Sequence, residues 1–310
     1  MKHPFLSSFS LLAKLFIYSI PVIISGCKSG KSEAQETTHS GTIHISVDES
    51  FKPVIDSQIS VFVASHPDAQ VNVRYKPEAD CLRDLFSDSI TRMVIVTRAM
   101  TAEEEQFFKD SLNFVPRQEI LAFDAVAVIV NNKAKDSIFT MEDIRQILAG
   151  TSKYALRPVM DGTKATSTVR YAIDSVLKGK PLGNNVTAAQ SSQAVVDYVA
   201  NNEDAIGFIG VSWIGNPEDK DQISFLEKVR IASIQCVSCT RETYVKPYQG
   251  NIAAKRYPMV RSLYYILKEN FAGLGSGFVN FLQYERGQLI FRRAYLWPAR
   301  MPFEVRQVEL

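Results

Sequence analysis

The stretch GTIHISVDESFKP, residues 41–53, passes from a strand into a helix. Alternate residues from Ile43 to Val47 are apolar, which is the pattern of a strand with one buried face. Apolar residues then recur at helical spacing as far as Val63, and Pro53 suits the first turn of that helix. The polar residues between the two elements therefore form a strand-to-helix turn.

The alternation of strands and helices continues along the chain. The run Met93–Val96 is apolar throughout, as expected of a buried parallel strand, and a long apolar strand is predicted over Ile120–Val130. Two capping boxes predict helix starts: Thr101 with Glu104, and Thr140 with Asp143. A chain of 310 residues is long enough for about two domains. The sequence therefore predicts an α/β fold of two lobes with mixed, mainly parallel sheets.

Residues 1–26 have the features of a bacterial lipoprotein signal peptide. Lysines precede the apolar run Leu15–Ile24, which is too short to span a membrane. The run ends in Ile-Ser-Gly-Cys, which resembles a lipobox, and this resemblance implies that Cys27 becomes lipid-modified. The alternative is plain secretion, with Cys27 an ordinary thiol. Residues 27–40 are polar and are predicted to form a flexible tether.

Composition excludes several classes of function. Both excess positive charges, on Lys2 and Lys14, precede Cys27, so the rest of the chain has no net charge. This balance argues against nucleic acid or a polybasic membrane surface as the partner. Four Cys and four His argue against a disulfide scaffold or a zinc cluster, and no metal or cofactor is predicted. Cys236 and Cys239 form a C-x-x-C pair, for which we expect a local disulfide or two buried thiols.

Three strand-to-helix junctions are rich in hydroxyl groups. They are residues 48–53, residues 97–101 with Arg98, and residues 161–168 with Arg170 just beyond. Ligands of open α/β sheets collect at such junctions, where hydroxyls, arginines and free backbone N–H groups suit a tetrahedral oxyanion. The alternative is that each Ser or Thr only caps its helix, and Ser50 is a plausible N-cap of this kind.

Several short segments, taken in order, carry a family resemblance. They are GTIHISVDESFKP (41–53), TRAMTAEE (97–104), AIGFIG (205–210), KPYQGN (246–251), YPMVR (257–261) and GLGSGF (273–278), followed by Gly287-Gln288. Their order and spacing resemble the phosphate-binding lipoproteins of bacterial phosphate ABC transporters, which have the type II periplasmic binding protein fold. The resemblance extends from about Gly41 to Pro298.

This resemblance implies site residues in each junction. Ser50 and Phe51 match the family's first loop, whose backbone N–H groups hold phosphate oxygens. Thr97 and Arg98 fall where the family has Ser followed by Asp or Arg. Thr166-Ser167-Thr168 matches the family's Ser-Gly-Thr loop at a helix N-terminus.

The chain also departs from the family in two places. Glu78-Ala79-Asp80 replaces the family's Gly-Ser-Gly loop, and Arg98 replaces the Asp found in some members. Family members can use a carboxylate to accept the proton of HPO₄²⁻, and we assign that role as a hypothesis to Glu78 or Asp80. The alternative is that Glu78 only begins a helix, where acids are favoured. The implied phosphate-binding residues are Ser50, Phe51, Glu78, Thr97, Arg98, Thr166, Ser167, Thr168 and Arg170.

The resemblance implies two lobes joined by a hinge of two chain crossings. We expect the crossings near residues 128–132 and 246–257. The expected lobes are residues 41–129 plus 257–310 for lobe one and residues 130–256 for lobe two.

The expected function is that of a lipid-anchored extracytoplasmic solute-binding protein, a monomer and not an enzyme, on the periplasmic side of the bacterial cell envelope. It would capture inorganic phosphate between the lobes and deliver it to the permease subunits of an ABC transporter. Three alternatives remain. The ligand could be another oxyanion or a phosphorylated compound, the chain could be a lipoprotein enzyme using its cysteine pair, or it could be a surface interaction protein whose cleft has decayed.

Overall fold

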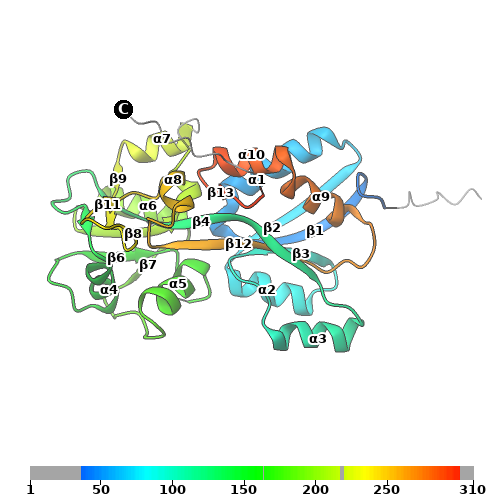
Figure 1. Cartoon of the computed structure of the whole chain (residues 1–310), viewed down its shortest axis with the longest axis horizontal. Helices are drawn as coiled ribbons and strands as arrows, with labels where there is room; N and C mark the ends of the chain where they lie inside the picture. The colour runs from blue at the N-terminus through cyan, green and yellow to red at the C-terminus, as the bar shows by residue number, and fades with distance from the viewer. Residues whose placement is uncertain (1–35, 163, 217–219, 301–310) are drawn as a thin grey trace, which may run out of the picture. The chain divides into compact units, whose positions relative to one another are not determined.

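The computed structural model describes residues 36–162, 164–216 and 220–300, which belong to one compact unit (Figure 1). The predicted signal peptide and Cys27 lie outside these residues. Along the described chain, strands and helices alternate as the sequence predicts. No helix among these residues is both long enough and apolar enough to cross a membrane.

The strands are β1 (Gly41–Asp48), β2 (Ala69–Lys76), β3 (Thr91–Val96), β4 (Arg117–Asn131), β5 (Ile138–Phe139), β6 (Arg157–Met160), β7 (Thr187–Ala188), β8 (Ala205–Gly210), β9 (Val229–Ile231), β10 (Ser233–Gln235), β11 (Tyr244–Val245), β12 (Val260–Leu267) and β13 (Trp297–Pro298). The helices are α1 (Lys52–Ser65), α2 (Glu78–Ser87), α3 (Ala102–Leu112), α4 (Met141–Ala149), α5 (Ser167–Tyr171), α6 (Ser192–Asn201), α7 (Lys220–Leu226), α8 (Gln249–Ala253), α9 (Leu274–Gln283) and α10 (Glu285–Arg293). Three shorter helical segments are η1 (Glu49–Phe51), η2 (Ala172–Val176) and η3 (Val211–Trp213).

The main sheet has the strand order β2-β1-β3-β12-β4-β8-β6-β7. Its parallel ladders form two groups, β2-β1-β3 and β8-β6-β7, and antiparallel pairing joins the groups through β12 and β4. A smaller sheet has the order β11-β10-β5. The predicted α/β class with mixed sheets is confirmed.

Strand β4 belongs to both groups of strands. Its residues 117–125 pair with β12, whereas residues 126–130 pair with β8. Figure 1 shows β4 and β12 running between the helices around β1–β3 and those around β6–β8. The change of partner falls just before residues 128–132, where we expect the first crossing.

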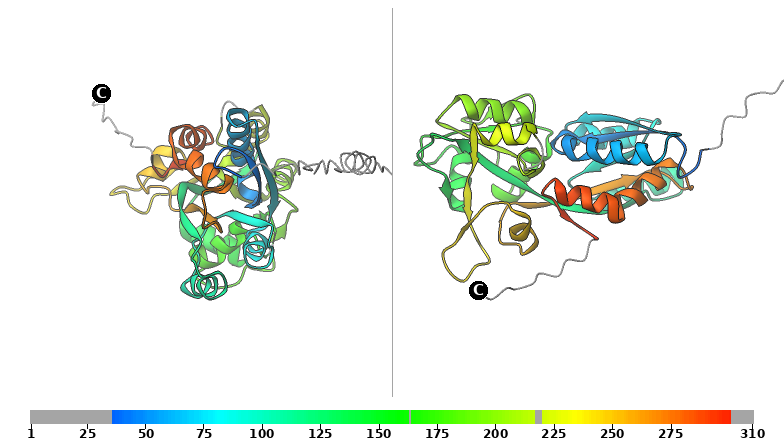
Figure 2. Two further views of the ribbon diagram at one scale, coloured as in Figure 1. Left: turned by 90° about the vertical axis from the view of Figure 1, so that its right-hand side faces the viewer. Right: turned by 90° about the horizontal axis from the view of Figure 1, so that it is seen from above.

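Both faces of β3 are buried, which explains why its run Met93–Val96 is apolar. Met93 and Ile95 belong to the core that contains residues of α1 and α9, whereas Val94 and Val96 pack with residues of α2 and α3. Helices α1 and α10 contact each other, and Figure 2 shows them side by side over one face of the sheet. Cys81 of α2 is fully buried, as expected of a core residue.

Local sequence signals place the helix ends. The two predicted capping boxes, at Thr101 and Thr140, are both present. The helix that begins after Thr140 ends at Gly150, which adopts a left-handed conformation with φ of 76°. At the other end of the described chain, residue Glu36 binds Arg92 and the backbone N–H of Leu274. Residues 36–40 of the predicted tether therefore belong to the folded unit, because the carboxylate of Glu36 has partners on it, and residues 27–35 lie outside the described residues.

Candidate functional site

The turn after β1 directs a serine hydroxyl inward. The carboxylate of Asp48 accepts the backbone N–H of Ser50 at 2.8 Å and so caps this turn. The expectation that Ser50 caps α1 is wrong, because Asp48 takes the capping role at η1. The Ser50 hydroxyl instead lies 3.4 Å from the hydroxyl of Ser167 and 3.5 Å from Oδ2 of Asp161. The structure thus brings together the first and third predicted junctions.

The third junction, between β6 and α5, adds more hydroxyl groups. Thr166 donates to Oδ1 of Asp161 at 2.9 Å, and Thr168 donates to Oδ2 at 3.3 Å. Thr166 also caps α5 by accepting the N–H of Val169, so the capping interpretation holds for this one residue. Ser167 and Thr168 are fully buried. Their hydroxyls therefore point into the protein toward the first junction.

A buried arginine that sequence reasoning missed lies between these junctions. Arg261 of β12 stands opposite Asp124 of β4, and its Nε donates to Asp124 Oδ2 at 2.8 Å. Its Nη1 donates to Ser167 Oγ at 2.9 Å. The guanidinium lies over the ring of Phe51, 5.1 Å from the ring centre. The alternation of residues along this strand could have indicated that Arg261 is buried, because Arg261 lies on the same buried face as Leu263.

Carboxylates surround this guanidinium. Burial and, to a smaller extent, the charge of Glu78 raise the pKa of Asp48 to about 7, although Arg261 opposes the shift. Burial also raises the pKa of Asp124 and of Asp161, against the effect of Arg261 on both. Loss of hydration lowers the pKa of Arg261, yet Asp124, Asp48 and Asp161 together outweigh that loss and hold the pKa above its ordinary value. The arginine is therefore charged, whereas burial disfavours the charged forms of the carboxyl groups around it.

Three other predicted site residues bind one another instead. Oε1 of Glu78 accepts both the N–H and the hydroxyl of Thr97 at 2.7 Å. Arg170 donates from Nε to Oε2 of Glu78 at 2.6 Å and from Nη2 to the Thr97 hydroxyl at 2.7 Å. Burial raises the pKa of Glu78, but the bonds from Arg170 and Thr97 outweigh burial and leave the pKa below its usual value. These contacts join α2 and β3 to α5.

Arg98 is separated from the buried hydroxyls by its own partner. Both of its Nη groups donate to Glu104 at 2.7 Å, and Glu104 also completes the capping box of α3. Arg98 instead lines a cavity of about 390 Å³, together with Glu78, Thr166 and Arg170. This cavity adjoins the buried cluster, because Thr166 also binds Asp161.

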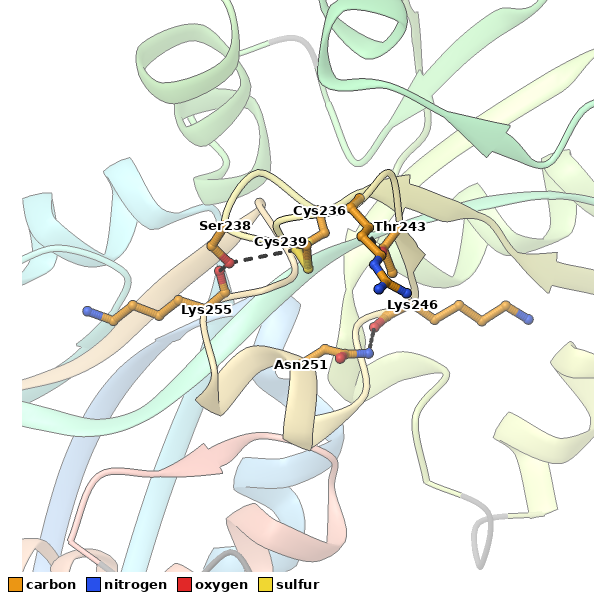
Figure 3. Close-up of a disulfide and its surroundings, with 8 residues drawn as sticks. Cys236, Ser238, Cys239, Thr243, Lys246, Asn251 and Lys255 are labelled. Atoms are coloured by element: carbon orange, nitrogen blue, oxygen red, sulfur yellow. Dashed lines mark hydrogen bonds between the residues drawn. A yellow bond between two sulfur atoms is a disulfide. The ribbon is translucent and has the colours of Figure 1, made fainter. Parts of the chain in front are cut away.

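The cysteine pair lies elsewhere. Cys236 and Cys239 form a disulfide in the segment between β10 and β11, as Figure 3 shows. The neighbouring Ser238 donates to the backbone carbonyl of Lys255 at 3.1 Å. The remaining described cysteine, Cys81, is buried, and burial raises the pKa of its thiol. Within the described residues, no group of His, Cys, Asp and Glu side chains could hold a metal ion.

The arrangement suits a small anion bound between two parts of the chain. Ser50 follows β1, whereas Ser167 follows β6, and Arg261 contacts the second and lies beside the first. The contacts of 3.3–3.5 Å among Ser50, Ser167, Thr168 and Asp161 are longer than a strong hydroxyl hydrogen bond of about 2.7–2.8 Å. These hydroxyls can therefore give up their contacts with one another and bind a ligand oxygen instead.

A family comparison agrees with this arrangement. The model of a PBP superfamily domain matches residues 32–286, which is most of the chain, so the protein belongs to this superfamily. The predicted family resemblance and two-lobed fold class are confirmed.

Three proteins similar to this chain have names that refer to phosphate. The phosphate-binding protein PstS of Bacillus subtilis is 24% identical over 296 residues, which cover 89% of each chain. An ABC-type phosphate transport receptor from Vibrio cholerae has a TM-score of 0.60 at 19% identity, covering 83% of this chain and all of that one. A Clostridium perfringens protein, assigned as a phosphate ABC transporter substrate-binding protein and solved with bound phosphate, has a TM-score of 0.68 at 19% identity, covering 84% of this chain and all of that one.

Proposed function

We propose that this protein captures inorganic phosphate in a cleft between two lobes and delivers it to the permease of an ABC transporter. Relatives described as phosphate-binding or phosphate-transport proteins support the ligand and the transport context. No covalent step is part of this function, so the protein acts as a binding protein and not as an enzyme.

One observation carries the proposal. Hydroxyls from the turns after β1 and β6, on Ser50 and Ser167, meet beside the buried guanidinium of Arg261. Neutral donors and one fixed positive charge match the four acceptor oxygens of a tetrahedral anion. In the proposed site, Ser50, Phe51 and the Thr166–Thr168 loop contact phosphate. Thr97, Arg98, Arg170 and Glu78 then form the second layer and the entrance.

The lobes of this proposal are residues 41–129 with 257–310, and residues 130–256. The change in the pairing of β4, from β12 to β8, supports a hinge in this strand. Contacts across the lobes also support closure, including the N–H of Ala79 with the carbonyl of Ala165 at 3.0 Å. Phosphate would favour closure because it binds groups from both lobes at once.

Calorimetry of the purified full chain with inorganic phosphate tests the function. We expect saturable binding of one phosphate per chain, which weakens about 30-fold in S50A/S167A, because the two lost hydrogen bonds are worth about 1 kcal/mol each. S57A is the matched control, since Ser57 is an exposed residue of α1. Heat of dilution only, from the folded wild type at millimolar phosphate, would rule the function out.

The proposal includes attachment to the membrane through a lipid on Cys27, with the folded part on the periplasmic side and the protein monomeric. The apolar run and the lipobox-like sequence before Cys27 support it. Mass spectrometry of the mature protein from bacterial membranes should find an N-terminal Cys27 bearing acyl chains. The variant C27S should keep its leader or be released from the membrane. A wild type with an unmodified thiol would favour plain secretion.

A phosphorylated small molecule is the second candidate ligand. The cavity of about 390 Å³ beside the site has apolar walls from Leu82, Val169 and Ile173, which could contact an organic group. Competition calorimetry with glycerol phosphate distinguishes the candidates. Inorganic phosphate should displace the ester if phosphate is the ligand, and tighter binding of the ester would favour the second candidate.

A further inference from the structure

Arg261 has the most completely enclosed guanidinium near the proposed site. Its side chain is 3% exposed, and Asp124 of β4 holds Nε. Ser167 of α5 holds Nη1, and the ring of Phe51 in η1 lies beneath the guanidinium. These partners come from separate segments of the chain and fix both the position and the plane of the group.

The Nη2 group of Arg261 is buried and has no hydrogen-bond partner among the described residues. A guanidinium carries five N–H donors, and a charged donor left unsatisfied in a protein interior is costly, by about 1–3 kcal/mol or more. Buried polar atoms almost always have partners in native proteins. The expected partner of Nη2 is therefore an acceptor that the chain itself does not supply.

The surroundings of Nη2 identify where that acceptor would bind. A Cβ atom placed on Gly210 would lie 3.2 Å from Nη2 and 3.3 Å from the carbonyl oxygen of Ser50. Gly210 ends β8, and its missing side chain leaves this side of the guanidinium uncrowded. Nη2 therefore lies close to the turn that contains Ser50. The hydroxyl of Ser50 is 3.4 Å from the hydroxyl of Ser167.

The other two arginines near the site already bind partners within the protein. Arg98 donates both Nη groups to Glu104, and Arg170 binds Glu78 and Thr97. Lys164 is exposed at the rim of the neighbouring cavity. Burial raises the pKa values of the carboxylates around Arg261, which lessens the negative charge that would oppose an incoming anion.

We infer that Arg261 is the fixed cation of the anion site, and that its Nη2 donates to an oxygen of a bound tetrahedral oxyanion beside Ser50 and Ser167. This inference rests on the proposed function and adds Arg261 to the phosphate-binding residues that the family resemblance implies. Because Arg261 pairs with Asp124 on β4, the strand shared by both groups of strands, the charge of the anion is linked to the hinge.

The test compares R261K with R157K. The second variant is the matched control because Arg157 lies on β6 in a half-exposed pair with Asp204. Calorimetry of each full chain uses phosphate, arsenate, sulfate and molybdate. We expect R261K to bind phosphate about 10- to 100-fold more weakly than wild type, because Lys cannot keep both the Asp124 bond and the bond to the anion. R157K should match wild type.

A thermal scan with and without phosphate separates ligand binding from a structural role. A contact to the anion predicts that R261K loses most of the phosphate-dependent rise in Tm, whatever its Tm without anion. Equal phosphate affinity in wild type and R261K would overturn the inference and leave the function intact. Wild-type chain that binds none of the four anions would overturn both.

If R261K does not fold, a crystal structure of the wild-type protein with phosphate answers the question. A phosphate oxygen within hydrogen-bond distance of Nη2 supports the assignment. Phosphate bound with no oxygen near Nη2 overturns it.

Discussion

The hydroxyl of Ser50 is available to a ligand because another side chain caps the turn. Asp48 accepts the backbone N–H of Ser50 and is itself 1% exposed, with Oδ2 unpartnered among the described residues. A carboxylate in such surroundings favours its neutral form. This single residue therefore links the geometry of the site to its dependence on pH.

The D48N variant should change how stability depends on pH. Burial raises the pKa of Asp48 from 3.8 to about 7 in the folded state, so the folded protein holds one more proton than the unfolded chain between those values. The contribution of Asp48 to stability is therefore fully present below pH 4 and is lost as pH rises to about 7. Urea unfolding should show D48N gaining stability relative to wild type as pH rises from 4 to 7. A pH-independent difference would contradict this assignment.

The E78Q variant should weaken the link between α2 and α5. Glu78 is 2% exposed and binds Thr97 and Arg170, so a neutral amide loses charge-assisted bonds. We expect a loss of about 1–3 kcal/mol in the free energy of unfolding at pH 7. The pKa of Glu78 is lowered on folding, so the contribution is present above its unfolded pKa and is lost as pH falls through the folded one.

The same variant tests the hypothesis that Glu78 selects phosphate. Calorimetry of E78Q with phosphate and sulfate measures the preference directly. Because the carboxylate of Glu78 is already occupied by Thr97 and Arg170, we expect that preference to remain. A collapse of the preference for phosphate would return the role to Glu78.

At the scale of elements, the segment between β10 and β11 is separate from the binding turns. Its disulfide joins Cys236 to Cys239, and within the described part of the chain its side chains form no hydrogen bond with Ser50, Ser167 or Arg261. The double variant C236S/C239S should therefore bind phosphate within about twofold of wild type. Calorimetry with phosphate measures this affinity. If the wild type has an enzymatic activity that the double variant loses while it still binds the anion, the alternative of an enzyme that uses its cysteine pair would be favoured.

Some local contacts of the elements could be predicted from the sequence, and others could not. The capping boxes at Thr101 and Thr140 fixed two helix starts, because a cap depends on residues three apart. The capping role of Ser50 was wrong, because Asp48 two residues earlier competes for the same N–H group. The pairing of Arg98 with Glu104 was also missed, although it spans only six residues, because rotamers and not spacing decide it.

At the scale of the whole molecule, a tryptophan of η3 lies at the proposed lobe boundary and can be used to test closure. Trp213 is 9% exposed, and its Nε1 donates to the carbonyl of Ser50 at 3.0 Å, across the proposed lobe boundary. The chain has two tryptophans, so W297F leaves Trp213 as the sole reporter. If the lobes close on phosphate, W297F fluorescence should shift to shorter wavelength as Trp213 loses contact with water. W213F should change little, and binding without a shift in W297F would argue against closure at this contact.

The sequence by itself determined the elements and brought out part of the candidate site. Hydrophobic periodicity follows from which face of each element is buried, so β1, α1 and β3 could be located from local patterns. Strand ends rich in hydroxyls likewise predicted Ser50 and the Thr166–Thr168 loop.

Only the tertiary structure decided which charges share the interior. Arg261, Asp124 and Asp161 meet because β12, β4 and β6 belong to one sheet. Arg261 and Asp124 lie on β12 and β4, Asp161 directly follows β6, and all three side chains are buried. No short-range pattern specifies such a meeting, since the partners are separated by long stretches of chain. The free-energy cost of burying a charge is offset only when the folded chain, or its ligand, supplies a partner.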